Sequence, residues 1–164
     1  MKRIGLLSDT HAHWDDKYLT YFKSCDEVWH SGDIGSVELV DQLAKHFTLR
    51  AVYGNIDGQE IRVRYPKVAS FTVEGVSVLM THIGGYPGRY DPSIRPLLYK
   101  IRPKLFITGH SHILKVMNDK HLKCLHINPG AAGISGFHQV RTLVRFVLDE
   151  GKIKDLDVIE LGKR

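Results

Sequence analysis

Apolar and polar positions over the first third of the chain alternate in blocks that predict strands and helices in turn. Short apolar runs are typical of buried strands, and apolar residues three or four positions apart are typical of helices that cover a sheet. Ser36 is placed to cap the second helix. Strands are predicted over 4–7, 26–30 and 48–53, and helices over 14–24 and 37–46. This order predicts an α/β sheet of parallel strands, whose ligands bind beyond the carboxyl ends of the strands.

The pattern changes in the middle of the chain, where strands follow one another with few helices between them. A hairpin is expected about Glu74-Gly75, and Asp91-Pro92 is expected to open a helix that runs to Arg102. Asn128-Pro129-Gly130 is expected to break the chain. Further strands are predicted over 70–73, 76–80, 104–108, 113–117, 123–127, 139–148 and 153–161.

Composition is that of an ordinary globular protein, and 164 residues suit one domain spanning 1–164. No apolar run approaches the roughly 20 residues that cross a bilayer, so no membrane partner is expected. Cys25 and Cys124 stand far apart, as expected for reduced thiols in a cytoplasmic protein. The net charge of +5 is spread along the chain, which favours a solvated basic surface over a nucleic-acid groove.

Ten histidines are unusual for this length, and several of them follow predicted strands. At five strand ends a tight turn carries a side chain able to bind a metal, usually beside glycine. Because the ends of parallel strands meet at one edge of a sheet, we expect these side chains to lie close together. The segments are Asp9-Thr10-His11, Gly32-Asp33, Gly54-Asn55, Thr81-His82 and Gly109-His110-Ser111-His112.

Together these segments offer two carboxylates, one amide oxygen and four imidazoles, with no thiolate. Such a set suits Mn²⁺, Fe, Co, Ni or Zn²⁺ better than Ca²⁺ or a structural zinc site. Seven donors exceed what one ion with bound substrate needs and suit two ions that share a carboxylate. Singly, Asp33 and Asn55 are equally explained as turn residues, and His82 as a hydrogen-bonded loop histidine. Their order and shared placement favour metal binding.

The series D-x-H, G-D, G-N-x-D, a lone His and G-H-x-H resembles the signature of the calcineurin-like metallophosphoesterases. With its compact length and the Asn-Pro-Gly segment, the chain is most similar to the small prokaryotic phosphodiesterase branch. The resemblance implies a four-layer αββα sandwich of the α+β type, with two facing mixed β-sheets flanked by helices. It also implies two divalent ions, manganese foremost, with Fe, Zn, Ni or Co as alternatives.

By this resemblance, one ion would be held by Asp9, His11 and His112, and the other by Asn55, His82 and His110, with Asp33 bridging both. A phosphodiesterase of this kind uses a metal-bridging hydroxide for in-line attack on phosphorus. The expected substrate is a small phosphoester.

Four residues near the motifs are expected to assist. Asn55 is assigned a catalytic hydrogen bond to the phosphoryl group, and Asp57 a role in orienting a ligand imidazole. Many monoesterases of the superfamily carry histidine where this chain has Ile56, which cannot protonate a leaving group. His13 is a candidate for that task, with a surface histidine as the alternative. Arg89 is a candidate phosphate clamp, with an ordinary surface arginine as the alternative.

Two other functions remain open at the level of sequence. The same branch resembles a eukaryotic retromer subunit that acts as a binding scaffold with a degraded metal site. The complete set of donors here argues against that function. A nuclease of the same superfamily would require salt-sensitive nucleic-acid binding, which the scattered charge does not favour. A homo-oligomer is compatible with the sequence.

Overall fold

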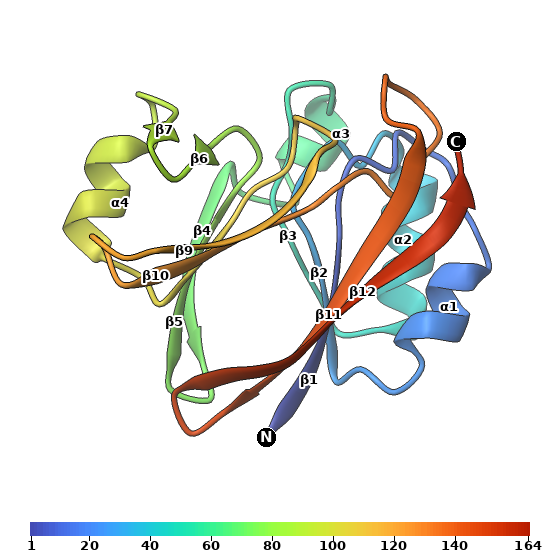
Figure 1. Ribbon diagram of the computed structural model, residues 1–164. Helices are drawn as coiled ribbons and strands as arrows, with labels where there is room; N and C mark the ends of the chain where they lie inside the picture. Colours follow the sequence, from blue (N-terminus) through green and yellow to red (C-terminus); the bar gives the residue numbers. More distant parts are fainter.

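The computed structural model describes residues 1–164, and two five-stranded sheets form its centre (Figure 1). In the first sheet β1, β2 and β3 run parallel, and β11 and β12 extend the sheet antiparallel on the other side of β1. In order across the sheet, the strands are β12 (Lys152–Lys163), β11 (Val140–Asp149), β1 (Lys2–Leu7), β2 (Glu27–His30) and β3 (Leu49–Ala51).

The second sheet is also mixed. Its three middle strands run parallel, and the two outer strands are antiparallel to their neighbours. A two-stranded hairpin, β6 (Gly85–Tyr86) and β7 (Arg89–Tyr90), stands apart from both sheets. In order, the second sheet contains β4 (Val68–Val73), β5 (Val76–Thr81), β8 (Leu105–Ile107), β10 (Cys124–Pro129) and β9 (Leu114–Asp119).

Helices cover the outer faces of the two sheets, which completes the predicted four-layer sandwich (Figure 1). Helices α1 (Lys17–Phe22) and α2 (Val37–His46) pack on the first sheet, and α4 (Arg95–Ile101) packs on the second. The short helix α3 (Gln59–Arg62) lies between β3 and β4 in the chain. No helix is long and apolar enough to cross a membrane.

The inner faces of the sheets bury a common core centred on Trp29. Its indole makes edge-on contacts with Phe71 from the second sheet and Phe146 from the first, at centroid distances of 5.0 and 5.7 Å. Indole Nε1 donates to Glu27, so the buried ring keeps a hydrogen-bond partner. This core joins the sheets and therefore fixes the relative position of the strand ends above it.

Several predicted elements are confirmed. Ser36 caps α2, with its Oγ accepting from the backbone N–H of Leu39 at 3.2 Å, and the helix ends at His46 as expected. The hairpin about Glu74-Gly75 is present as β4 and β5. The long C-terminal hairpin forms β11 and β12.

Other predicted boundaries were wrong. Helix α4 begins at Arg95, because the carboxylate of Asp91 accepts from the backbone and hydroxyl of Ser93 and forms a turn instead of a cap. Helix α1 begins at Lys17, since Asp15 accepts the backbone N–H of Lys17 in the preceding turn. Strand β10 continues through Asn128-Pro129, so the break falls at Gly130.

Candidate metal centre

All seven predicted metal donors lie at one rim of the molecule, beyond the carboxyl ends of five parallel strands. They follow β1, β2 and β3 of the first sheet and β5 and β8 of the second. Since the two sheets face each other, their strand ends meet at this rim, and donors from both halves of the chain come together there.

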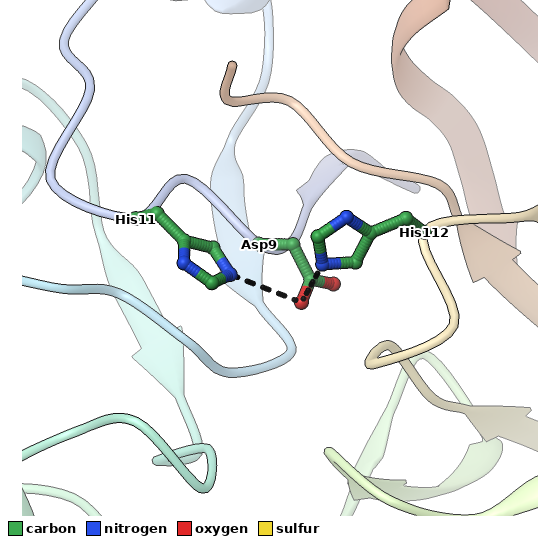
Figure 2. A group of neighbouring side chains, drawn as sticks. All are labelled: Asp9, His11 and His112. Atoms are coloured by element: carbon green, nitrogen blue, oxygen red, sulfur yellow. Dashed lines mark ion pairs between the residues drawn. The ribbon is translucent and has the colours of Figure 1, made fainter. Parts of the chain in front are cut away.

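The first group contains Asp9, His11 and His112, whose donor atoms lie within 4.8 Å of one another. Figure 2 shows the two imidazoles on opposite sides of the Asp9 carboxylate, both directed at the same oxygen. His112 Nε2 lies 3.2 Å from Asp9 Oδ1, and His11 Nε2 lies 3.8 Å from it. The structure thus brings together the three residues that the resemblance assigns to one ion.

The second group contains Asp33, His82 and His110, again with donor atoms within 4.8 Å of one another. His82 Nε2 lies 3.2 Å from Asp33 Oδ2, and Asn55 Oδ1 lies 3.1 Å from His110 Nδ1. Asn55 therefore belongs to the same cluster, as expected for the second ion.

Asp33 connects the two groups. Its Oδ2 lies 3.2 Å from His82 Nε2 in the second group and 3.4 Å from His11 Nε2 in the first. The Asp33 carboxylate therefore lies between the two donor groups.

Backbone carbonyls determine which ring nitrogens face the carboxylates. Nδ1 of His82 lies 2.8 Å from the carbonyl oxygen of Ser31. A carbonyl only accepts hydrogen bonds, so in the neutral ring Nδ1 carries the proton and Nε2 presents a lone pair to Asp33. A lone pair that faces a carboxylate oxygen at this distance is repulsive unless a proton or a metal cation lies between them.

The position of the proton on His112 is set in the same way by His138, a residue that the sequence did not single out. His138 Nε2 donates to the carbonyl of Gly133 at 2.8 Å, which leaves its Nδ1 free to accept. That Nδ1 lies 3.2 Å from His112 Nδ1, so the His112 proton is held there and Nε2 faces Asp9 with a lone pair. The only sequence signal for His138 was the unusual number of histidines.

These observations fit divalent cations. Asp9 Oδ1, His11 Nε2 and His82 Nε2 are buried and have no hydrogen-bond partner within the protein. Buried polar atoms without partners are costly, and these three all belong to the two donor groups. Carboxylate, amide and imidazole donors are also the set that first-row divalent ions accept.

The electrostatics of the site favour positive charge. Burial alone would raise the pKa of Asp9, but its interactions with His11 and His112 hold that pKa well below its usual range. Burial opposes ionisation of Asp33 as well, and contact with His82 lowers the pKa of Asp33 nevertheless. The neighbouring carboxylates of Asp9 and Asp33 raise the pKa of His11. Burial would lower the pKa of His82, but Asp33 and Asp9 outweigh it and raise that pKa. The carboxylates thus stay ionised and attract a cation.

The backbone is strained where the donors sit. Asp9, His11, Asp33, His110 and His112 all have positive φ values, between 44° and 72°. This left-handed region is uncommon for residues other than glycine, and each instance costs on the order of 1–3 kcal/mol. Strain concentrated on five of the seven donors indicates that the fold holds these side chains for function.

Two glycines allow the backbone to pass close to the carboxylates of the donor groups, as their places beside predicted donors suggested. A Cβ at position 54 would lie 2.1 Å from Asp33 Oδ1, and one at position 109 would lie 2.3 Å from Ser8 Oγ and 3.0 Å from Asp9 Oδ2. Ser8 Oγ and the backbone N–H of His110 both donate to that second Asp9 oxygen, which leaves Oδ1 for the metal. Any larger residue would displace a carboxylate.

Three residues that were predicted to assist the reaction do not have the contacts expected for those roles. Asp57 does not orient an imidazole: its carboxylate accepts from the backbone N–H groups of Ile34, Gly35 and Gly54, and so joins the loops that carry Asp33 and Asn55. This prediction for Asp57 was wrong because its two carboxylate oxygens accept from three backbone N–H groups and from no histidine.

The other two assisting residues make no contact with the donor groups. The imidazole of His13 forms no hydrogen bond, and only its backbone takes part in the turn before α1. Arg89 lies on the β6–β7 hairpin and lines surface hollows with Tyr90 and Arg95, away from the donors.

Comparison with known proteins agrees with the geometry. Residues 1–151 match the model of the calcineurin-like phosphoesterase superfamily domain. The chain is 24% identical to a protein of Methanothermobacter thermautotrophicus described as a "probable metallophosphoesterase", over 97% of this chain and 92% of that protein.

Solved structures share the fold. One, described as a novel archaeal phosphodiesterase, has a TM-score of 0.73 at 21% identity and covers 97% of this chain and 99% of its own. Wild-type Vps29 from Entamoeba histolytica, complexed with Zn²⁺, has a TM-score of 0.67 at 17% identity and covers 96% of this chain and 98% of its own. Given the match to the family model over most of its length, the chain belongs to the calcineurin-like phosphoesterase superfamily.

Proposed function

We propose that this protein is a phosphodiesterase that depends on two divalent metal ions, with manganese as the expected metal. The observation that carries the proposal is the pair of donor groups joined by Asp33, with Asn55 beside His110. Family membership supports a phosphoester substrate, and the structurally similar archaeal protein is described as a phosphodiesterase.

In this proposal one ion would be held by Asp9, His11 and His112, and the other by Asn55, His82 and His110. Asp33 would contact both. Ions bound in such a pair activate water for in-line attack on phosphorus and neutralise charge on the phosphoryl oxygens. The protein contributes by fixing the donors before substrate arrives. Ser31 and His138 set the proton positions of His82 and His112, and Ser8 holds the Asp9 carboxylate.

Positive side chains beside the second group suit an anionic substrate. Arg62 and Lys67 line a cavity of about 200 Å³ together with Asn55 and His82. Arg62 is held there by hydrogen bonds to the backbone carbonyls of Asp57 and Asn55. We infer that this cavity attracts the non-bridging oxygens of the phosphoester and leaves Asn55 free to donate its amide hydrogens to them.

Diesters with good leaving groups are the expected substrates. Ile56 follows Asn55 directly and is 46% exposed, so an apolar side chain occupies the position where an acid would protonate the leaving alcohol. Esters whose leaving group departs without a proton, such as aryl esters, should therefore react fastest.

Two alternatives have less support. Likeness to Vps29 extends to the fold alone, and a scaffold would not need seven converging donors on a strained backbone. A nuclease would need a continuous basic surface, whereas the basic residues of this protein are scattered along the chain.

The direct test is hydrolysis of bis(p-nitrophenyl) phosphate and p-nitrophenyl phosphate by Mn²⁺-loaded protein, alongside Asp33→Ala. We expect the diester to be the better substrate and the variant to lose activity by about 10³-fold or more, as removal of a key electrostatic group does elsewhere. A folded, metal-loaded protein that hydrolyses neither ester, or an Asp33→Ala variant as active as the wild type, would overturn the proposal.

A further inference from the structure

A surface hollow of about 470 Å³ lies on the outer side of the second sheet and contains none of the predicted metal donors. Three elements enclose it: the β6–β7 hairpin, helix α4 and the turn between β9 and β10, which Figure 1 shows together on one side of that sheet. Six of its lining residues carry polar or charged side chains: Arg89, Tyr90, Arg95, Tyr99, Asp119 and His121.

Arg89 and Arg95 bring unpaired positive charge to this hollow. Both residues are exposed, and neither guanidinium group lies within ion-pair distance of a carboxylate. Four arginines elsewhere in the protein do form ion pairs with carboxylates: Arg50, Arg64, Arg141 and Arg145. Two unpaired guanidinium groups at one hollow give it a positive potential that attracts anions.

Asp119 brings a carboxylate to the lining, but the protein uses both of its oxygens. Oδ2 accepts from the hydroxyl of Tyr90 at 2.5 Å, and Oδ1 accepts from the backbone N–H groups of His121 and Leu122 at 2.9 and 3.0 Å. This carboxylate therefore links the β6–β7 hairpin to the turn after β9. Its single negative charge leaves the two guanidinium groups in excess.

Aromatic rings support the side chains that line the hollow. Arg95 and Tyr99 lie one turn apart on α4, and the guanidinium carbon of Arg95 is 5.7 Å from the centroid of the Tyr99 ring. The same ring lies 6.4 Å from that of His121. Tyr90 packs on Phe106 at a centroid distance of 5.7 Å and so anchors the hairpin to the sheet. The walls of the hollow are thus fixed by packing.

These side chains suit a phosphoryl group better than other anions. A guanidinium group binds phosphate through two parallel hydrogen bonds. A phosphoryl group also offers three acceptor oxygens and up to two charges, enough for Arg89, Arg95 and His121 together, whereas a carboxylate has two oxygens and one charge. A nucleobase would need a free aromatic face, but the two tyrosine rings already pack against other side chains.

We propose that this surface, the Arg89 hollow, binds the phosphoryl group of inorganic phosphate or of a small phosphomonoester at a site separate from the metal centre. Its basis is the pair of unpaired guanidinium groups beside a carboxylate whose oxygens are already occupied. The site needs no metal ion and goes beyond the proposed hydrolysis. Arg89 then contacts a phosphoryl group other than the one at the metal centre.

The test uses the metal-free full chain, so that no metal ion binds phosphate. Inorganic phosphate, added at constant pH and ionic strength, should shift the ring signals of His121 in ¹H–¹³C NMR spectra until they reach a plateau. The signals of His46, an exposed histidine on α2, should stay in place. Glycerol 3-phosphate, titrated in the same way, distinguishes the two sources of the phosphoryl group, because the natural kind of ligand should bind more tightly.

Matched variants test the two arginines. Arg89→Gln and Arg95→Gln should each weaken the apparent affinity for phosphate by about tenfold, because each loses a charge-assisted pair of hydrogen bonds. Both side chains are exposed, so neither change should disturb folding. Arg64→Gln removes the same charge from an exposed arginine that is paired with Asp41, and it should keep the affinity of the wild type.

Three results would overturn the proposal. They are the absence of a saturating shift at His121 with either ligand, a shift at His82 and His110 of the metal centre instead, and an affinity unchanged in both glutamine variants of the hollow. Because no metal is present in this experiment, its outcome is independent of whether the metal-loaded protein hydrolyses a phosphodiester.

Discussion

Nδ1 of His112 lies 3.2 Å from Nδ1 of His138, a residue in the loop after β10. Since His138 is itself held by the carbonyl of Gly133, the pair forms a chain of hydrogen bonds that ends on His112 Nδ1 and leaves Nε2 of the same ring facing Asp9. The loop from 131 to 139, which contains no regular strand or helix, thus sets the orientation of a donor in the first group.

His138→Ala should weaken binding at the first donor group, because His112 would lose the partner that fixes its ring. We expect a loss of about 10–100-fold in Mn²⁺ affinity at one of two sites, measured by isothermal titration calorimetry. His138→Gln retains an acceptor oxygen and should restore part of the affinity, whereas His121→Ala, at an exposed turn, should change nothing. Wild-type affinity in His138→Ala would contradict this role.

Gly54→Ala tests how closely the backbone approaches Asp33. The added methyl group would lie 2.1 Å from Asp33 Oδ1 and must displace the carboxylate that joins the two donor groups. We expect metal stoichiometry to fall below two ions per chain. Gly58→Ala is a matched control four residues away, since its Cβ would meet nothing within 4 Å. If both variants bound metal like the wild type, Asp33 would not be positioned in this way.

Trp29→Ala should be among the most destabilising single substitutions. Trp29 is fully buried and contacts aromatic rings from both sheets, so its removal leaves a cavity at their interface. The free energy of unfolding should fall by about 3–5 kcal/mol, measured by urea denaturation followed by circular dichroism. Trp14→Ala, at a half-buried site on the surface, should cost clearly less. Equal losses in the two variants would argue against the shared core.

Glu27 gives a pH-dependent contribution to stability. Burial alone would raise its pKa, but hydrogen bonds from Arg50 Nε at 2.6 Å and Lys2 Nζ at 3.0 Å hold that pKa below its ordinary value of 4.5. Because folding favours the ionised form, the stabilisation is complete above the unfolded-state pKa and is lost as pH falls through the lower folded-state pKa.

Glu27→Gln should therefore lower the free energy of unfolding by about 1–2 kcal/mol at neutral pH, less than a fully buried pair because both basic partners are part-exposed. The difference from wild type should shrink in urea titrations repeated at about pH 3. Glu160→Gln, at an exposed position on β12, should have little effect at either pH. A difference that grew on acidification would contradict the direction of the pKa shift.

Much of the centre follows from local sequence patterns. The seven donors could be predicted because each follows a short apolar run, and the ends of parallel strands converge by the geometry of the sheet. The cap at Ser36 and the hairpin at Glu74-Gly75 are equally local signals. Each of these features depends on residues that are close together in the sequence, so the sequence alone is enough to predict it.

The residues that sequence did not predict depend on contacts between distant segments. His138 lies in a loop without periodicity, and its role arises only when that loop packs against His112. Asp57 sits within the motif, yet three backbone donors from neighbouring loops determine its role.

We expect hydrolysis of a phosphodiester by this protein to require two ions, one at each of the donor groups that Asp33 joins. The most direct measurement is the rate of bis(p-nitrophenyl) phosphate hydrolysis as Mn²⁺ is added stepwise to metal-free protein, with bound metal determined at each step. We predict little activity when one ion is bound per chain and a steep rise as the second ion binds. Full activity in the metal-free protein or with a single bound ion, or no activity with two, would contradict the account.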